Sequence, residues 1–254
     1  TLDRSAMPTL PDIVVVTPTY NEKDNLPILA AGILAHPGFR ILVVDDGSPD
    51  DTADRAEAAG ADVVVRSTPN RGKGAAVRQG VLAAHGRTVA FTDADLSYAP
   101  DQLLRLLDGV EAGWDVVVGS RQHVETRTVV RAGRLREVGG RVINLLTGIV
   151  LLGRYRDTQC GLKAMRSDVG RLVFGHAHID GFAFDVEVFH LVERYRLTLL
   201  EVPVEVVNSS RSTVNVARDA ARLVRDLFRV RRWGRIGLYE ADVSELPLRT
   251  DGVV

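Results

Sequence analysis

The feature that most restricts the fold of this chain is a regular alternation of short apolar runs with segments of helical spacing. Apolar, β-branched runs recur at Ile13–Thr17, Ile41–Val44, Val63–Val65, Val89–Thr92 and Val116–Val118. Continuous apolar runs of this length are typical of strands buried on both faces, as in a parallel sheet. They predict a sheet with a helical layer on each side.

The segments between these runs have the apolar spacing of helices. They cover Leu26–Leu34, Thr52–Ala59, Lys73–Ala84 and Asp101–Val110. Strands that alternate with helices form α/β sandwiches around a mostly parallel sheet. We therefore predict one Rossmann-like α/β domain over residues 11–207, preceded by a polar tail at 1–10.

The regular alternation stops after Arg121. Beyond that residue we predict a long helix at Arg136–Leu152, a shorter helix at Asp185–Tyr195 and a strand at Leu199–Val207. A basic segment at 208–241 and a polar tail at 242–254 follow.

The basic segment contains an arginine-rich amphipathic helix, at about Val214–Arg232. The arginines recur at steps of three or four residues, which places them along one side of a helix; they are Arg218, Arg222, Arg225, Arg229 and Arg232. Leu223, Leu227 and Phe228 supply an apolar surface, and Trp233 suits an interface. We predict that this helix binds an anionic membrane surface. The alternative is that it packs its apolar side on the domain and exposes its arginines to water.

Composition narrows the range of partners and compartments. Lysine and arginine number 32 against 33 acidic residues, so no overall positive field favours a nucleic-acid partner. The single cysteine, Cys160, forms no internal disulfide, in keeping with a reducing compartment. The apolar stretch Val142–Gly153 falls short of the ~20 residues that a spanning helix needs. With no leader at its start, we expect the chain to be cytoplasmic and peripheral at the inner face of the membrane.

Polar residues follow the predicted strands at the points where ligands bind in open α/β sheets. They are Pro18-Thr19-Tyr20-Asn21-Glu22, Asp45-Asp46-Gly47-Ser48, Asn70-Arg71-Gly72-Lys73-Gly74 and Asp93-Ala94-Asp95. Each run also has an ordinary interpretation as a turn or a helix cap. Their meeting at one rim of the sheet favours a binding site.

The acidic pair at the end of the fourth run predicts a metal site. No glycine-rich phosphate loop is present, so another group must neutralise a bound phosphate. Asp93 and Asp95 can share Mg²⁺ or Mn²⁺ and leave coordination positions for phosphate oxygens and water.

The same runs, in the same order and followed by Gly119-Ser120-Arg121, resemble glycosyltransferase family 2 with a GT-A fold. The resemblance implies a nucleotide-sugar donor and a metal-dependent transfer. It places the nucleoside at Pro18, Tyr20, Glu22 and Asp46, with Lys73 nearby, Asp93 at the ribose–diphosphate region and Asp95 on the metal. It places the acceptor phosphate at Arg121 and Arg136.

A later motif, Arg156-Asp157-Thr158-Gln159-Cys160-Gly161, with Asp185-Val186-Glu187, is similar more narrowly to the dolichyl- and polyprenyl-phosphate glycosyltransferases, above all their glucosyl branch. This implies transfer of glucose from UDP-glucose to a lipid phosphate, with GDP-mannose as the alternative donor. It places Asp157 beside the reacting sugar or acceptor. The alternative role of Asp157 is to cap a turn closed by Gly161. At two positions where mannosyl relatives often carry Gln and Ser, the chain has Ser97 and Gly140.

Two other classes remain open at this stage. Asp93-Ala94-Asp95-Leu96-Ser97 superficially resembles the nucleophile motif of metal-dependent phosphohydrolases, although that motif normally follows the first strand. A catalytically silent module that binds nucleotide sugars or membranes is the other alternative. An assay of donor hydrolysis and transfer separates the three.

Overall fold

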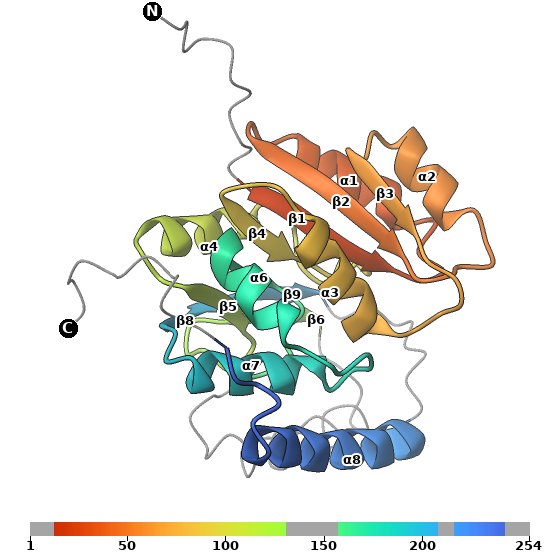
Figure 1. The fold of residues 1–254 in the computed structure, drawn as a ribbon. Helices are drawn as coiled ribbons and strands as arrows, with labels where there is room; N and C mark the ends of the chain where they lie inside the picture. The colour runs from red at the N-terminus through yellow and green to blue at the C-terminus, as the bar shows by residue number, and fades with distance from the viewer. Residues whose placement is uncertain (1–12, 131–156, 208–215, 242–254) are drawn as a thin grey trace, which may run out of the picture.

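The computed structural model describes residues 13–130, 157–207 and 216–241 (Figure 1). The strands predicted from the apolar runs are present as β1 (Ile13–Thr19), β2 (Phe39–Asp45), β3 (Val63–Arg66), β4 (Thr88–Phe91) and β5 (Val116–Ser120). The helices predicted between them are α1 (Leu26–Leu34), α2 (Thr52–Ala58), α3 (Lys73–Ala83) and α4 (Gln102–Glu111). Hydrophobic periodicity therefore located the boundaries of these strands and helices to within two residues.

The main sheet has seven strands in the order β3-β2-β1-β4-β7-β5-β8. Two of them come from the second half of the chain, β7 (Lys163–Arg166) and β8 (Leu199–Pro203). Only β7 runs antiparallel to its neighbours, β4 and β5. The predicted mostly parallel sheet is confirmed, whereas β7, which begins with a lysine and has four residues, was not predicted.

Helices cover both faces of the sheet. Alternate residues of the central strands therefore face opposite helical layers. Val14 and Val16 of β1 belong to the layer that contains α3, α6 (Ser167–Gly175) and α7 (Phe184–Arg194). Ile13 and Val15 belong to the opposite layer, with α1, α2 and α4. Figure 1 shows α3, α6 and α7 together on one side of the sheet.

Two strand predictions need correction. Val63–Val65 was expected to be buried on both faces, but β3 is an edge strand and Val63 is 47% exposed. The single strand expected at Leu199–Val207 divides at the buried Val204 into β8, which pairs with β5, and β9 (Glu205–Val207). The partner of β9 is β6 (Arg127–Val130), which the sequence did not predict.

The arginine-rich helix is present as α8 (Val216–Arg235) and packs against α7. Leu223, Leu227 and Val230 are buried in the same core as α3 and α7. After α8 the chain turns back at Gly237, which has φ 78°, and buries Tyr239 completely. None of the helices within the described ranges is long and apolar enough to span a bilayer. The helix predicted at Arg136–Leu152 lies outside those ranges.

Candidate active site

The carboxyl ends of β1, β2 and β4 meet at one edge of the sheet. Thr19 of β1 pairs in register with Asp45 of β2. The amide of Thr92, just after β4, donates to the carbonyl of Val16 at 3.1 Å. The residues that follow these strands therefore begin from the same rim, where the sequence placed the donor.

Asp93 and Asp95 follow β4 and flank the buried Ala94. Asp93 Oδ1 lies 2.6 Å from Nζ of Lys73, the first residue of α3. Burial opposes the charge on Lys73, but Asp93 and Asp185 raise its pKa above the ordinary value, so the ammonium group stays protonated. Asp95 Oδ1 accepts a hydrogen bond of 3.0 Å from the amide of Ser97, which fixes the second carboxylate in a tight turn.

The side chains at this rim fit a divalent cation held jointly with a diphosphate. Asp93 Oδ1 is shielded from solvent and, apart from the ion pair with Lys73, has no hydrogen-bond partner in the described ranges. Those ranges contain no cluster of three or more acidic, histidine or cysteine side chains that could hold a metal. Asp93 and Asp95 would therefore supply two carboxylates, and phosphate oxygens and water the remaining ligands, as Mg²⁺ prefers.

Asp46 organises the loop that leads into α3. Its buried carboxylate accepts hydrogen bonds from the amides of Arg71 at 2.9 Å and Gly72 at 2.7 Å. Gly72 has φ 109°, a conformation that favours glycine, and a Cβ there would lie 2.6 Å from the carbonyl oxygen of Asp180. Asp46, predicted to hold the nucleoside, thus also sets the position of Lys73.

The other residues predicted at the nucleoside lie at the same rim. Pro18 is within β1, and Tyr20, just beyond it, is 48% exposed. Glu22 accepts a hydrogen bond of 2.8 Å from the side chain of Asn25, and its amide donates to Thr52 Oγ1 at 3.1 Å. An exposed aromatic ring beside fixed polar groups is suited to stacking on a base.

Asp157 and Arg121 form a fixed pair. Arg121 donates to the Asp157 carboxylate from its backbone amide at 2.9 Å, from Nε at 2.7 Å and from Nη2 at 2.8 Å. The Asp157 side chain is fully buried, whereas that of Arg121 is 41% exposed. Burial raises the pKa of Asp157, but the hydrogen bonds from Arg121 outweigh it and hold the pKa below the ordinary value. The carboxylate therefore stays ionised and bound to the guanidinium, while part of the Arg121 side chain remains exposed to solvent.

Asp157 also forms the turn that was considered as its alternative role. Its Oδ1 accepts a hydrogen bond of 3.1 Å from the amide of Gln159. The turn carries Cys160 and Gly161 inward, and burial raises the pKa of the Cys160 thiol. Arg136, the other residue predicted at the acceptor phosphate, lies outside the described ranges.

Sequence reasoning missed a second buried ion pair close to this rim. Lys163 of β7 is fully buried, and its Nζ lies 2.6 Å from Asp185 Oδ1. Burial raises the pKa of Asp185 above its ordinary value. The available signal was a single lysine between Leu162 and Ala164, because a charge in an apolar strand needs a buried partner.

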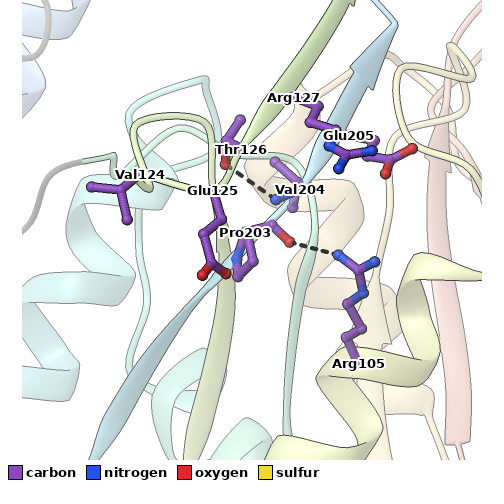
Figure 2. Close-up of a pocket in the computed structure, with 8 residues that line it drawn as sticks. All are labelled: Arg105, Val124, Glu125, Thr126, Arg127, Pro203, Val204 and Glu205. Atoms are coloured by element: carbon purple, nitrogen blue, oxygen red, sulfur yellow. Dashed lines mark hydrogen bonds between the residues drawn. The ribbon is translucent and has the colours of Figure 1, made fainter.

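Two surface hollows lie in different parts of the molecule. One of about 560 Å³ lies between residues 70–73, residues 178–183 and α8, and Lys73 lines it. The other, of about 820 Å³, is drawn in Figure 2 and lies beside α4, β6 and β9. Arg105 at its wall donates to the carbonyl of Pro203 at 3.5 Å. None of the predicted site residues that the structure describes lines the second hollow, and of these two hollows only the first adjoins the candidate site.

Comparison with solved structures identifies the fold. Glucosyl-3-phosphoglycerate synthase from Mycobacterium tuberculosis, in complex with Mn²⁺, UDP-glucose and phosphoglyceric acid, superposes with a TM-score of 0.65. The match covers 89% of this chain and 79% of that chain at 22% identity. The architecture is therefore GT-A, as the sequence predicted.

The family follows from the sequence match. The model described as Glycosyl transferase family 2 matches residues 14–172, more than half of the chain. The chain belongs to glycosyl transferase family 2.

The relatives confirm the narrower resemblance. Dolichyl-phosphate beta-glucosyltransferase of Drosophila melanogaster is 32% identical over 241 residues, which cover 86% of this chain and 74% of the relative. Polyprenol monophosphomannose synthase of Mycolicibacterium smegmatis is 32% identical over 232 residues, which cover 87% of this chain and 86% of the relative. The Saccharomyces cerevisiae dolichyl-phosphate beta-glucosyltransferase is 28% identical and covers 89% of this chain and 75% of the relative.

Proposed function

We propose that the protein catalyses the inverting transfer of a hexose, with glucose favoured, from a UDP-sugar to a polyprenyl phosphate. The proposal includes Mg²⁺ or Mn²⁺ as cofactor. It is supported by the dolichyl-phosphate glucosyltransferases among the relatives and by the Mn²⁺ and UDP-glucose bound in a protein of the same fold.

One observation carries the proposal: the short segment 157–161 contacts Arg121, the proposed anion site, and Asp93, the proposed cation site. At one end Asp157 holds the partly exposed Arg121 guanidinium. At the other end Gly161 lies directly against the Asp93 carboxylate. A transferase of this kind needs both sites side by side, one for the leaving diphosphate and one for the attacking phosphate.

The chemistry follows from the charge of the acceptor. An oxygen of the lipid phosphate attacks the anomeric carbon as the bond from that carbon to the diphosphate breaks, which inverts its configuration and releases UDP. Because the attacking phosphate is already an anion near pH 7, no general base is required. Arg121, held by Asp157, and the predicted Arg136 orient the acceptor, and Lys73 faces the leaving diphosphate. A divalent cation at Asp93 and Asp95 would stabilise the charge that develops on UDP.

The test is a panel of UDP- and GDP-sugars, assayed with Mn²⁺ by thermal shift and by transfer to a polyprenyl phosphate. We expect UDP-glucose to raise the melting temperature and to support transfer. Asp95→Asn should abolish Mn²⁺-dependent binding and transfer at an unchanged fold. Asp101→Asn, at an exposed aspartate beyond the same strand, is the matched control. Full transfer by the Asp95 variant in excess chelator would refute the metal site.

GDP-mannose is the second candidate donor. The observation that favours it is the similarity to the polyprenol monophosphomannose synthase of M. smegmatis, in which the match covers 86% of the relative. Transfer from GDP-mannose without transfer from UDP-glucose would replace the first proposal with this one. Hydrolysis of a phosphate ester without transfer would support the phosphohydrolase. Donor binding without either reaction would support the catalytically silent module.

We also propose that α8 holds the enzyme on an anionic membrane surface at the cytoplasmic side. Its apolar residues are divided between two directions: Leu223, Leu227 and Val230 are buried, whereas Phe228 is 70% exposed. Among residues 222–235 of α8, the exposed arginines are Arg222, Arg225, Arg229, Arg232 and Arg235, whereas the predicted Arg218 lies outside the side chains that the structure describes. Near an anionic bilayer each contributes about 1 kcal/mol, enough together to hold the protein.

Liposome co-sedimentation tests this second proposal. A truncation near residue 208 would remove Val230 and Tyr239 from the core, so point variants are the better tool. The triple variant Arg222→Gln, Arg225→Gln, Arg229→Gln should lose binding to anionic vesicles. A control triple variant at the exposed Arg40, Arg55 and Arg66 should retain it. Equal binding by both variants, or binding independent of lipid charge, would remove α8 from the mechanism.

A further inference from the structure

A bend at Gly161, in the segment 160–162 that leads into β7, packs against the first carboxylate of the Asp93–Asp95 pair. A Cβ built on Gly161 would lie 2.5 Å from Asp93 Cγ and closer still to Oδ2. Real Cβ atoms essentially never approach another heavy atom this closely, so an alanine here must displace the carboxylate. The φ of Gly161 is outside the left-handed region, and space is therefore the reason that glycine is required.

Lys163 holds this bend in place through a hydrogen bond. Its Nζ donates to the carbonyl oxygen of Cys160 and to Asp185 Oδ1, both at 2.6 Å. The ammonium also lies 5.3 Å from the ring centre of Phe91 and 5.7 Å from that of Phe189. A fully buried lysine is a poor device for stability alone, because the desolvation of both charges offsets most of the attraction between them.

Asp185, the other member of the ion pair, belongs to the start of α7, which packs against the start of α3 beside Lys73. Asp185 is the second residue of α7, and its neighbour Phe184 would lie 2.7 Å from a Cβ on Gly74. The amide of Ala75 donates to the carbonyl of Asp180 at 3.1 Å, which ties the start of α3 to the loop before α7. Gly161 and Lys73 thus contact the Asp93 carboxylate directly, and the Lys163–Asp185 pair links the bend that carries Gly161 to the start of α7.

We propose that Gly161 and Lys163 are positioning residues that set the Asp93 carboxylate for the metal–diphosphate complex of the donor. Gly161 leaves the space that the carboxylate occupies, and Lys163 holds the bend in place by its hydrogen bond to the Cys160 carbonyl. This inference rests on the proposed function, because it assigns the two residues to the donor site of that reaction.

The first experiment compares Gly161→Ala with Gly175→Ala, whose added Cβ meets no atom within 4 Å. Mn²⁺ is titrated calorimetrically into each protein at saturating UDP, and the melting temperature is measured without ligand. Loss of an outer partner of a metal ligand typically weakens metal binding by about 10- to 100-fold. We expect a loss in that range for Gly161→Ala and none for Gly175→Ala. Equal Mn²⁺ affinities in the two variants would overturn the role of Gly161.

The second experiment separates positioning by Lys163 from a structural role. Lys163→Met and Asp185→Asn each leave one buried partner unpaired, and each should lower the melting temperature by roughly 10 °C. The double variant has no unpaired charge in this pair and should recover most of that loss. Its Mn²⁺ affinity should stay low, because nothing holds the Cys160 carbonyl. Recovery of Mn²⁺ affinity together with the melting temperature would show that Lys163 is only a charge partner.

The wild-type protein separates failure of this inference from failure of the proposed function. If the wild type binds neither UDP nor Mn²⁺, the proposed donor site is wrong. If the wild type binds both, and the Gly161 and Lys163 variants bind them equally well, only the positioning role is wrong.

Discussion

Replacing Asp157 with asparagine tests whether the Asp157–Arg121 pair acts on the acceptor. Asparagine keeps one oxygen acceptor and turns an amide donor toward a guanidinium that offers only donors. Oδ2 accepts hydrogen bonds from the amide and Nε of Arg121, and Oδ1 accepts them from Nη2 of Arg121 and the amide of Gln159, so about two of the four are lost whichever oxygen is replaced. Bonds to a charged group contribute about 1.5–3 kcal/mol each. Because the Arg121 side chain is 41% exposed and regains water, we reduce the total to about 2 kcal/mol.

That loss should lower the melting temperature by about 6 °C for a chain of this size. The effect on catalysis should be larger, because a guanidinium displaced by about 1 Å costs a reaction about 100-fold in rate. This corresponds to about 2.7 kcal/mol of transition-state stabilisation. Steady-state kinetics at varied donor and acceptor concentrations should show a lower kcat and a higher KM for the acceptor, with an unchanged KM for the donor.

Asp115 offers a matched control for the stability loss. It is buried at the other end of the β5 region and accepts hydrogen bonds from Arg166 Nη1 at 3.2 Å and from the amide and hydroxyl of Thr198, both at 2.8 Å. Asp115→Asn should therefore lower the melting temperature similarly and leave kcat unchanged. The reasoning is refuted if both variants lose activity equally, or if the Asp157 variant loses donor affinity instead.

Three further predictions concern stability, measured by urea denaturation. Tyr239→Phe should cost about 2 kcal/mol, because it removes a 2.6 Å hydrogen bond to the buried carboxylate of Glu187; no change would mean that water replaces the hydroxyl. Gly80→Ala should cost about 2 kcal/mol, because its Cβ would overlap Val16, while the activity of the folded fraction should persist. Burial lowers the pKa of His190 below 6.5, so the unfolded chain takes up a proton first and stability should fall as pH drops below about 6.5. His190→Leu should flatten that slope, and an unchanged slope would exclude His190 as its source.

The sequence alone determined the sheet with its covering helices, and the rim of the sheet at which the predicted donor-site residues meet. Apolar runs such as Ile13–Thr17 identify buried strands because burial on both faces leaves no place for polar residues. The acidic pair at Asp93 and Asp95 was recognisable because it directly follows such a run. Local pattern was less informative at β6 and β7, which are short and contain charged residues, and at β3, whose edge position depends on strand order.

Only the tertiary structure decided which side chains act on one another. Lys163 and Asp185 are 22 residues apart, and Asp157 and Arg121 are 36 apart, and no periodicity relates such positions. The contact of Gly161 with Asp93 depends on where an antiparallel strand inserts between β4 and β5. The two sides of α8 likewise became distinct only when Leu223 and Leu227 packed into the core shared with α3 and α7 and Phe228 stayed exposed. The physical reason is that spacing along the chain reports which residues share one surface of a strand or helix, whereas packing decides what that surface meets.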